Sequence, residues 1–152
     1  MKLEQYLMDQ RIAFERVHHE PTFTANRMAE CLHISGKEVA KSVLLRGPHG
    51  YMLAVLPSTH RIDLERMKRE LDDEDVEMAS EQEIEQLFPD CETGALPPFG
   101  SLYHLPTIVD DSLTQDERIV FDAQCHDEAI RMTFRDFQFL EHPRIGHFAR
   151  PC

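Results

Sequence analysis

Hydrophobic positions near the N-terminus recur with the spacing of an amphipathic helix. Leu3, Leu7 and Ile12 are separated by polar residues, which predicts an opening helix, and residues 14–19 follow as a short extended segment. Pro21 then interrupts the pattern, because proline lacks the N–H that regular structure uses. The chain is therefore expected to begin with one helix and one strand.

Capping residues predict two further helices before the first long apolar run. Thr24 is a potential N-cap for residues 25–34, in which Met28 lies on the apolar face. Residues 35–38 read Ser-Gly-Lys-Glu, which is a capping-box pattern for a short helix. That helix would lead to Lys41, at the start of a β-prone segment.

Apolar, β-prone runs form the next part of the chain and return near its end. Residues 42–47 and 51–58 flank a Gly-Pro-His-Gly turn, so they predict a buried hairpin. Further strands are predicted at residues 76–80, 106–112, 118–123 and 129–134. The last is the clearest, because Ile130, Met132 and Phe134 alternate with polar residues.

Helices are predicted between these strands. Asp63 begins a helix in which apolar residues recur at helical spacing. Ser80 and Glu83 form a capping box for the next helix, which must stop near Pro89. A final helix is predicted over residues 135–142.

The order of these elements predicts the fold class. Helices interspersed with tight hairpins favour an α+β (mixed α/β) fold, with a mixed, largely antiparallel sheet under helical cover. A chain of 152 residues is expected to form one domain, residues 1–152. There is no apolar run of membrane-spanning length and no C-x-x-C pair, so we expect a cytoplasmic protein, monomeric by default, without disulfides.

The net charge of −12 disfavours general binding to nucleic acid, but the charge is unevenly distributed. Residues 1–70 hold 11 Lys and Arg against 9 Asp and Glu, whereas residues 71–152 hold 5 against 19. Four basic residues lie close in the first half: Arg27, Lys37, Lys41 and Arg46. They are either a local basic surface for a phosphate backbone or ordinary solvated charges.

The loop over residues 92–100 combines two glycines with two consecutive prolines, so it is bent and rigid together. Gly94, Ala95 and Leu96 carry N–H groups immediately before the prolines, which cannot donate. Such donors could form an anion-binding or oxyanion site. Alternatively, the loop is a structural turn that packs Phe99 into the core.

Two side chains elsewhere could take part in chemistry. Lys41 enters an apolar strand, so its ammonium either reaches solvent or faces a cleft, where it could hold a phosphate or a carbonyl. His126 either hydrogen-bonds in a cleft or packs as a polar residue. Its neighbour Cys125 would point the opposite way on a strand, which disfavours a thiol mechanism. The histidines show no metal-ligand spacing, so no metal site is expected.

Several segments, taken in order, resemble the YbaK/ProX family of aminoacyl-tRNA deacylases. The family is similar to the editing domain inserted in bacterial prolyl-tRNA synthetases. The matching segments span most of the chain: EVAKSVLL, YMLAVLP, RIDLERMK, ASEQEIEQLFPDCETGALPPFG, TIVDDSL, IVFDA and HDEAI. Lys41 matches the family's functional lysine, and Gly94 to Pro98 match its G-x-x-x-P loop. Near His126, many relatives carry a glycine where this chain has Gln124 and Cys125, a replacement expected to remove access to positive φ.

The resemblance implies an enzyme that hydrolyses the ester between a small, wrongly attached amino acid and tRNA. Lys41 would anchor the phosphate or ribose, and Gly94 would donate its N–H to the ester carbonyl. The same resemblance implies a substrate wall made by these residues: Met28, Ala95, Leu96, Pro98 and His126. Phe23, Leu56 and Phe99 are further candidates for apolar lining or for the core.

The implied partners are mischarged tRNA and, as a candidate, an aminoacyl-tRNA synthetase, with no membrane and no cofactor. The first alternative is a module of the same fold that binds aminoacyl-tRNA or a nucleotide without hydrolysis. A second is a hydrolase that depends on Cys125, and a third is a purely structural or oligomeric protein.

Overall fold

The computed structural model describes three parts of the chain, which are residues 2–18, 38–92 and 94–152. The helices predicted between residues 24 and 37 lie outside the described residues, and so do Met28 and Phe23. The described parts include the predicted hairpin, Lys41, Gly94 and His126.

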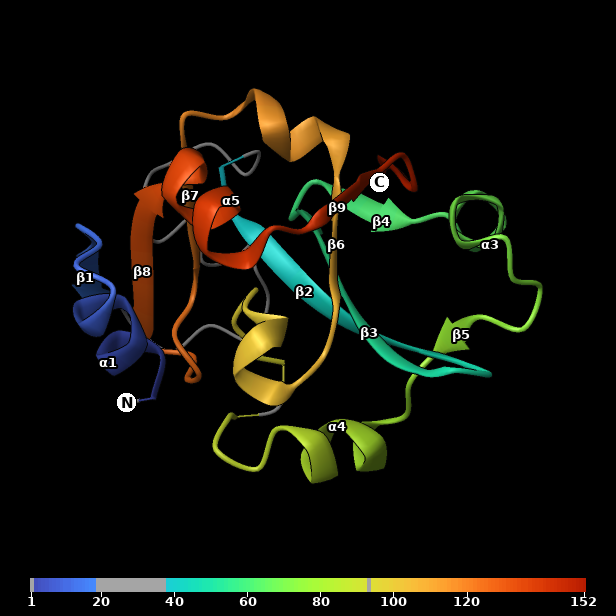
Figure 1. Cartoon of the computed structure of the whole chain (residues 1–152), viewed down its shortest axis with the longest axis horizontal. Coiled ribbons are helices and arrows are strands. Elements are labelled where there is room, and N and C mark those ends of the chain that lie inside the picture. Colours follow the sequence, from blue (N-terminus) through green and yellow to red (C-terminus); the bar gives the residue numbers. More distant parts are fainter. Residues whose placement is uncertain (1, 19–37, 93) are drawn as a thin grey trace.

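The strands of the described residues form three sheets (Figure 1). One is antiparallel, in the order β1 (Glu15–His18), β8 (Glu128–Thr133), β7 (Arg118–Asp122). The largest has the order β5 (Glu77–Met78), β2 (Ala40–Gly47), β3 (Gly50–Pro57), β6 (Thr107–Asp110), β9 (Arg144–Gly146). The third pairs β10 (Ala149–Pro151) with β4 (His60–Ile62). Among these strand pairs of the described residues, only β3–β6 and β6–β9 are parallel, so the mixed, largely antiparallel arrangement is confirmed.

The predicted hairpin is the centre of the largest sheet. β2 and β3 pair in register from Ala40 opposite Pro57 to Gly47 opposite Gly50. Gly50 has a φ of 122°, a conformation that side chains with a Cβ rarely adopt, and this allows the tight reversal. Side chains alternate on β2, so Leu44 packs on one face of the sheet and Leu45 on the other.

Helices cover the sheets as the sequence predicts: α1 (Lys2–Asp9), α3 (Leu64–Leu71), α4 (Glu81–Leu87) and α5 (Phe134–Glu141). Asp63 caps α3 by accepting hydrogen bonds from two backbone N–H groups. The capping box of Ser80 and Glu83 is present at the start of α4. None of the helices in the described parts is long and apolar enough to cross a membrane.

Three short strands and two shortened ones depart from the sequence prediction. β4, β9 and β10 have no alternating pattern and form only because distant partners complete their hydrogen bonds. The strand predicted over 76–80 is limited to exposed Glu77–Met78. The strand predicted over 106–112 ends at Asp110, where a 3₁₀ helix (Asp111–Gln115) begins.

Two core clusters lie on opposite faces of the largest sheet. One joins α1 and α5 to the three-stranded sheet around Phe99, Phe121 and Phe137, each 1% exposed or less. The other packs α3 and the C-terminal strand against Leu56 and its neighbours. Phe99 and Leu56 therefore belong to the core.

A buried carboxylate ties the C-terminal segment to the sheet. Asp110 Oδ1 accepts hydrogen bonds from Phe148 N at 2.9 Å and from Ala149 N at 2.8 Å. Its Oδ2 accepts from the N–H and the hydroxyl of Ser112. Burial raises the pKa of Asp110, but these hydrogen bonds outweigh it and leave the pKa below its ordinary value.

We expect Asp110→Ala to lower the free energy of unfolding by about 3 kcal/mol, because buried N–H donors lose their acceptor. The lowered pKa means that the ionised carboxylate stabilises the fold, and that this contribution is lost as the pH falls. The difference between wild type and variant should therefore shrink in acid. Urea denaturation at several pH values measures it, with exposed Asp111→Ala as control; equal losses in both variants would contradict the assignment.

Candidate active site

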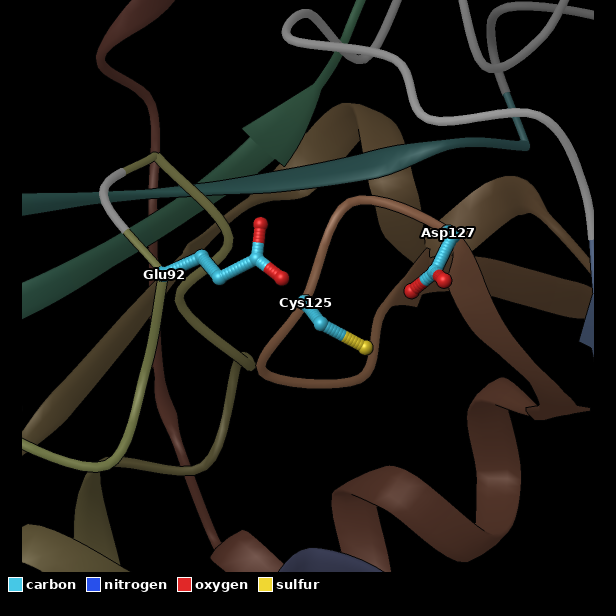
Figure 2. A group of neighbouring side chains, drawn as sticks. All are labelled: Glu92, Cys125 and Asp127. Atoms are coloured by element: carbon cyan, nitrogen blue, oxygen red, sulfur yellow. The ribbon is translucent and has the colours of Figure 1, made fainter.

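Two loops from distant parts of the sequence lie against each other at one end of the three-stranded sheet. One is the predicted glycine and proline loop, and the other is the turn that connects β7 to β8. The N–H of Glu92 donates to the carbonyl of Gln124 at 2.8 Å, which fixes the two loops together. Figure 2 shows Glu92 and Cys125 on these two neighbouring loops.

Gln124 occupies a left-handed backbone conformation, with a φ of 73°. The expectation that glutamine removes access to positive φ at this turn is therefore wrong. The side chain explains why the conformation is tolerated: its Nε2 donates to Asp90 and to the Tyr103 hydroxyl, each at 2.8 Å, and its Oε1 accepts from Leu3 N at 3.4 Å. The side chain is 3% exposed, so these bonds form inside the protein and offset the backbone strain.

Gly94 and His126 are brought together by the paired loops. Gly94 has a φ of 84° and is exposed, whereas His126 is 4% exposed. A Cβ placed on Gly94 would lie 3.5 Å from His126 Cε1. The imidazole therefore forms a wall directly beside the glycine, and only a residue without a side chain leaves the space between them open.

Asp122, at the end of β7, is a titratable group that the sequence reasoning missed. Its Oδ2 lies 3.8 Å from His126 Nδ1, and its side chain is 12% exposed. Burial raises the pKa of Asp122 to about 7; the His126 charge opposes this rise and Glu92 adds to it. Within the described residues, Asp122 Oδ1 is buried without a hydrogen-bond donor. A carboxyl that titrates near neutrality inside a polar site can transfer protons.

Lys41 lies on β2, and burial lowers the pKa of its ammonium while an interaction with Cys152 opposes that effect. A parallel bridge joins Val39 to Val120, and strand alternation predicts that Lys41 and Asp122, two positions further on, project from the same face. Among the described residues, no hydrogen bond or ion pair joins Lys41 to Asp122 or to the Gly94 loop. The convergence of Lys41 with the Gly94 loop therefore remains a prediction.

The backbone N–H groups of the glycine and proline loop are not equally available to a ligand. The N–H of Ala95 donates to the carbonyl of Glu92 at 3.0 Å and is not directed outward. Ala95, Leu96 and Pro98 are all buried, and Leu96 packs with Leu44 among its apolar neighbours. The loop is thus a structural turn along most of its length, with Gly94 as its exposed point.

Cys125 is poorly suited to nucleophilic or metal chemistry. Burial, as the largest cause, raises the pKa of its thiol to about 11, so the thiolate is scarce at neutral pH. Its sulfur lies within 4.8 Å of carboxylate oxygens of Glu92 and Asp127 (Figure 2). A protonated thiol with two carboxylates is a weak ligand set, and it supports neither a Cys125-dependent hydrolase nor a metal centre.

Of the four basic residues considered either as a local basic surface or as ordinary solvated charges, the structure describes two, Lys41 and Arg46. Arg27 and Lys37 lie outside the described residues. Arg46 forms ion pairs with Glu77 and with Glu83, the latter at 3.1 Å. Its charge is therefore largely balanced by acidic neighbours and contributes little to an anion-binding surface.

Comparisons with known proteins place the matching region around this site. A family model described as "Aminoacyl-tRNA editing domain" matches residues 19–140. The proline–tRNA ligases of Thermosipho africanus and Thermosipho melanesiensis are 29% identical over 87 and 86 residues, respectively. Each match covers 57% of this chain but 15% of the ligase, so the chain spans a small part of those proteins.

Solved structures share the whole fold. A crystal structure of a hypothetical protein superposes with a TM-score of 0.90 and 18% identity, covering 99% of this chain and 100% of that one. A proposed trans-editing enzyme for prolyl-tRNA synthetase superposes with a TM-score of 0.87 and 19% identity, covering 98% of this chain and 95% of that one. With the family model matching most of its length, this chain belongs to the aminoacyl-tRNA editing domain family.

Proposed function

We propose that this protein is an aminoacyl-tRNA deacylase that hydrolyses the ester between tRNA and a wrongly attached small amino acid. The observation that carries the proposal is the site beside Gly94, where His126 and Asp122 lie together in a family that edits aminoacyl-tRNA. Family membership supports the substrate class. The geometry supports a role for each residue.

Gly94 is the proposed position of the ester carbonyl. Its positive φ turns the exposed end of the loop toward the site, and its lack of a side chain leaves room beside His126 for a small aminoacyl group. The Gly94 N–H would donate to the oxygen on which negative charge develops. Ala95, Leu96 and Pro98 hold this point rigid, since all three are buried.

Asp122 and His126 are the proposed proton carriers. The oxygen of a water molecule attacks the ester carbonyl carbon, and its proton passes to this pair or to the neighbouring ribose hydroxyl. The bond from the carbonyl carbon to the ribose oxygen then breaks, and the ribose oxygen takes up the proton. The products are the free amino acid and tRNA with both terminal hydroxyls. Lys41 would hold the terminal phosphate or ribose.

Replacing Gly94 by Ala should lower kcat/KM for deacylation roughly a hundredfold, because the added Cβ fills the space beside His126 and alanine is strained at this positive φ, which shifts the N–H donor. A loss of stability of about 1 kcal/mol is expected from alanine at positive φ. Gly50→Ala is the matched control: it also has positive φ, but no atom lies within 4 Å of the added Cβ. Full activity of Gly94→Ala would show that the loop does not contact the ester.

Replacing Lys41 by Ala should reduce hydrolysis of mischarged tRNA roughly a hundredfold, since the anchoring cation is lost. Lys41→Met separates charge from packing, because it keeps a long apolar side chain. Wild type and variants are assayed on alanyl-, cysteinyl-, seryl- and threonyl-tRNA, with circular dichroism to monitor folding.

If Lys41→Ala hydrolyses every substrate as fast as wild type does, Lys41 does not take part in the active site. Wild-type protein that binds aminoacyl-tRNA without releasing the amino acid would identify a binding module instead.

Replacing Asp122 by Asn should stabilise the protein at alkaline pH. The pKa of Asp122 is raised in the fold, so ionisation destabilises the folded state as the pH rises from about 4 to about 7. Asparagine carries no such charge, and the gain at pH 8 should be on the order of 2 to 4 kcal/mol. Little difference is expected at pH 4.

Denaturation curves at both pH values measure this effect, and deacylation between pH 5 and 9 tests the role in catalysis. The wild-type activity should change with an apparent pKa near 7 that Asp122→Asn lacks. Identical pH profiles would exclude Asp122 as a proton carrier.

A further inference from the structure

Four arginines gather at the edge formed by α3, β4 and β10, although the protein as a whole is acidic. They are Arg61, Arg66, Arg69 and Arg150, called here the arginine surface. Arg61 and Arg150 stand directly opposite each other in the β4–β10 pair, and both are exposed. Like charges in such positions repel, so this pairing is unfavourable unless an anion lies between them.

Internal carboxylates balance only part of this charge. Asp63 Oδ2 lies 3.7 Å from Arg66 Nε and 3.8 Å from Arg150, so one carboxylate is shared by two guanidinium groups. The same carboxylate also caps α3. Within the described residues, neither Arg61 nor Arg69 has a carboxylate at ion-pair distance.

Part of the arginine surface is concave. A cleft of about 370 Å³ is lined by Arg66, Arg69, Glu70 and His147. Glu70 is the acidic residue of this lining, and its oxygens are engaged: one accepts the His147 N–H at 2.9 Å, and the other lies 3.9 Å from Arg144. Among residues 2–18, 38–92 and 94–152, no acceptor takes the hydrogen-bond donors of the Arg69 guanidinium, which are therefore available to a ligand.

The arginine surface is connected to the candidate active site through the C-terminal segment. Cys152, which follows β10, donates its N–H to the carbonyl of Thr59 at 3.1 Å. The same residue interacts electrostatically with Lys41, which lies on the face of β2 that Asp122 shares. The C-terminal segment thus runs from Arg150 on β10 to Cys152 beside Lys41, and the group on Cys152 that raises the pKa of Lys41 carries negative charge.

We propose that the arginine surface binds the phosphate backbone of the tRNA acceptor arm and directs its 3′ end toward Lys41 and Gly94. This inference rests on the proposed deacylase function, which supplies the identity of the polyanion. A guanidinium group can bind two phosphate oxygens at once. A concave basic surface can contact several phosphates of a nucleic-acid backbone, which isolated charges cannot do. The acidic remainder of the protein repels the rest of the tRNA and restricts binding to this edge.

The test uses the full chain with uncharged tRNA, and measures affinity by fluorescence anisotropy over a series of salt concentrations. The variant R61Q/R69Q/R150Q should bind tRNA roughly tenfold or more weakly than wild type. The plot of log K against log salt should also become less steep, with the magnitude of its slope smaller by about 2 to 3. R118Q/R135Q is the matched control, because both of these arginines are exposed and lie on other elements. R61Q/R69Q, which breaks no ion pair within the described residues, replaces the triple variant if that variant fails to fold.

Hydrolysis assays separate this inference from the proposed function. The triple variant should show a raised KM on mischarged tRNA, with kcat unchanged, and normal hydrolysis of an aminoacyl ester of the trinucleotide CCA, which lacks the acceptor stem. If the triple variant has the tRNA affinity and salt dependence of wild type, the tRNA-binding role of the arginine surface is refuted, whereas the proposed deacylase function is not. Binding of poly-glutamate through these arginines, with tRNA affinity unchanged, would also refute the tRNA-binding role. Failure of wild type to hydrolyse either ester would instead refute the deacylase.

Discussion

The parallel bridge between Val39 and Val120 is the constraint that positions β2, which carries Lys41, against β7, which carries Asp122. It joins the start of β2 to β7, and the N–H of Val120 donates to the carbonyl of Glu38 at 2.9 Å beside it. Both valines are at most 1% exposed, so the contact is held by burial as well as by hydrogen bonding. Because side chains alternate along strands, this register predicts that Lys41 and Asp122 share a face.

The candidate site combines a rigid wall, formed by the Gly94 loop and His126, with a carboxyl group, Asp122, whose pKa is near neutral pH. The loop is anchored in the core by its apolar residues, so Gly94 is held beside His126 without support from a ligand. The same burial that makes the wall rigid removes water from Asp122 and raises its pKa to about 7. The rigidity of the wall and the raised pKa of Asp122 therefore have a common cause, which is exclusion of solvent from the junction of two loops.

Charged residues are unevenly distributed over the whole protein, not only around the candidate site. Most acidic residues lie in the second half of the sequence, yet the arginine surface combines residues from both halves, such as Arg61 and Arg150. An acidic protein can in this way present a restricted cationic edge. Such an edge gives orientation to a polyanion, because binding elsewhere on the molecule is opposed by like charge.

The sequence by itself determined the helices α1, α3, α4 and α5, the β2–β3 hairpin, the capping residues such as Asp63 and Ser80, and, through its ordered motifs, the editing-domain family. These follow from local spacing and from short-range hydrogen bonds. Only the tertiary structure decided that β10 pairs with β4, that Gln124 takes a left-handed conformation, and that Asp122 lies beside His126. Those features depend on burial and on contacts between residues far apart in the chain, which local patterns do not encode.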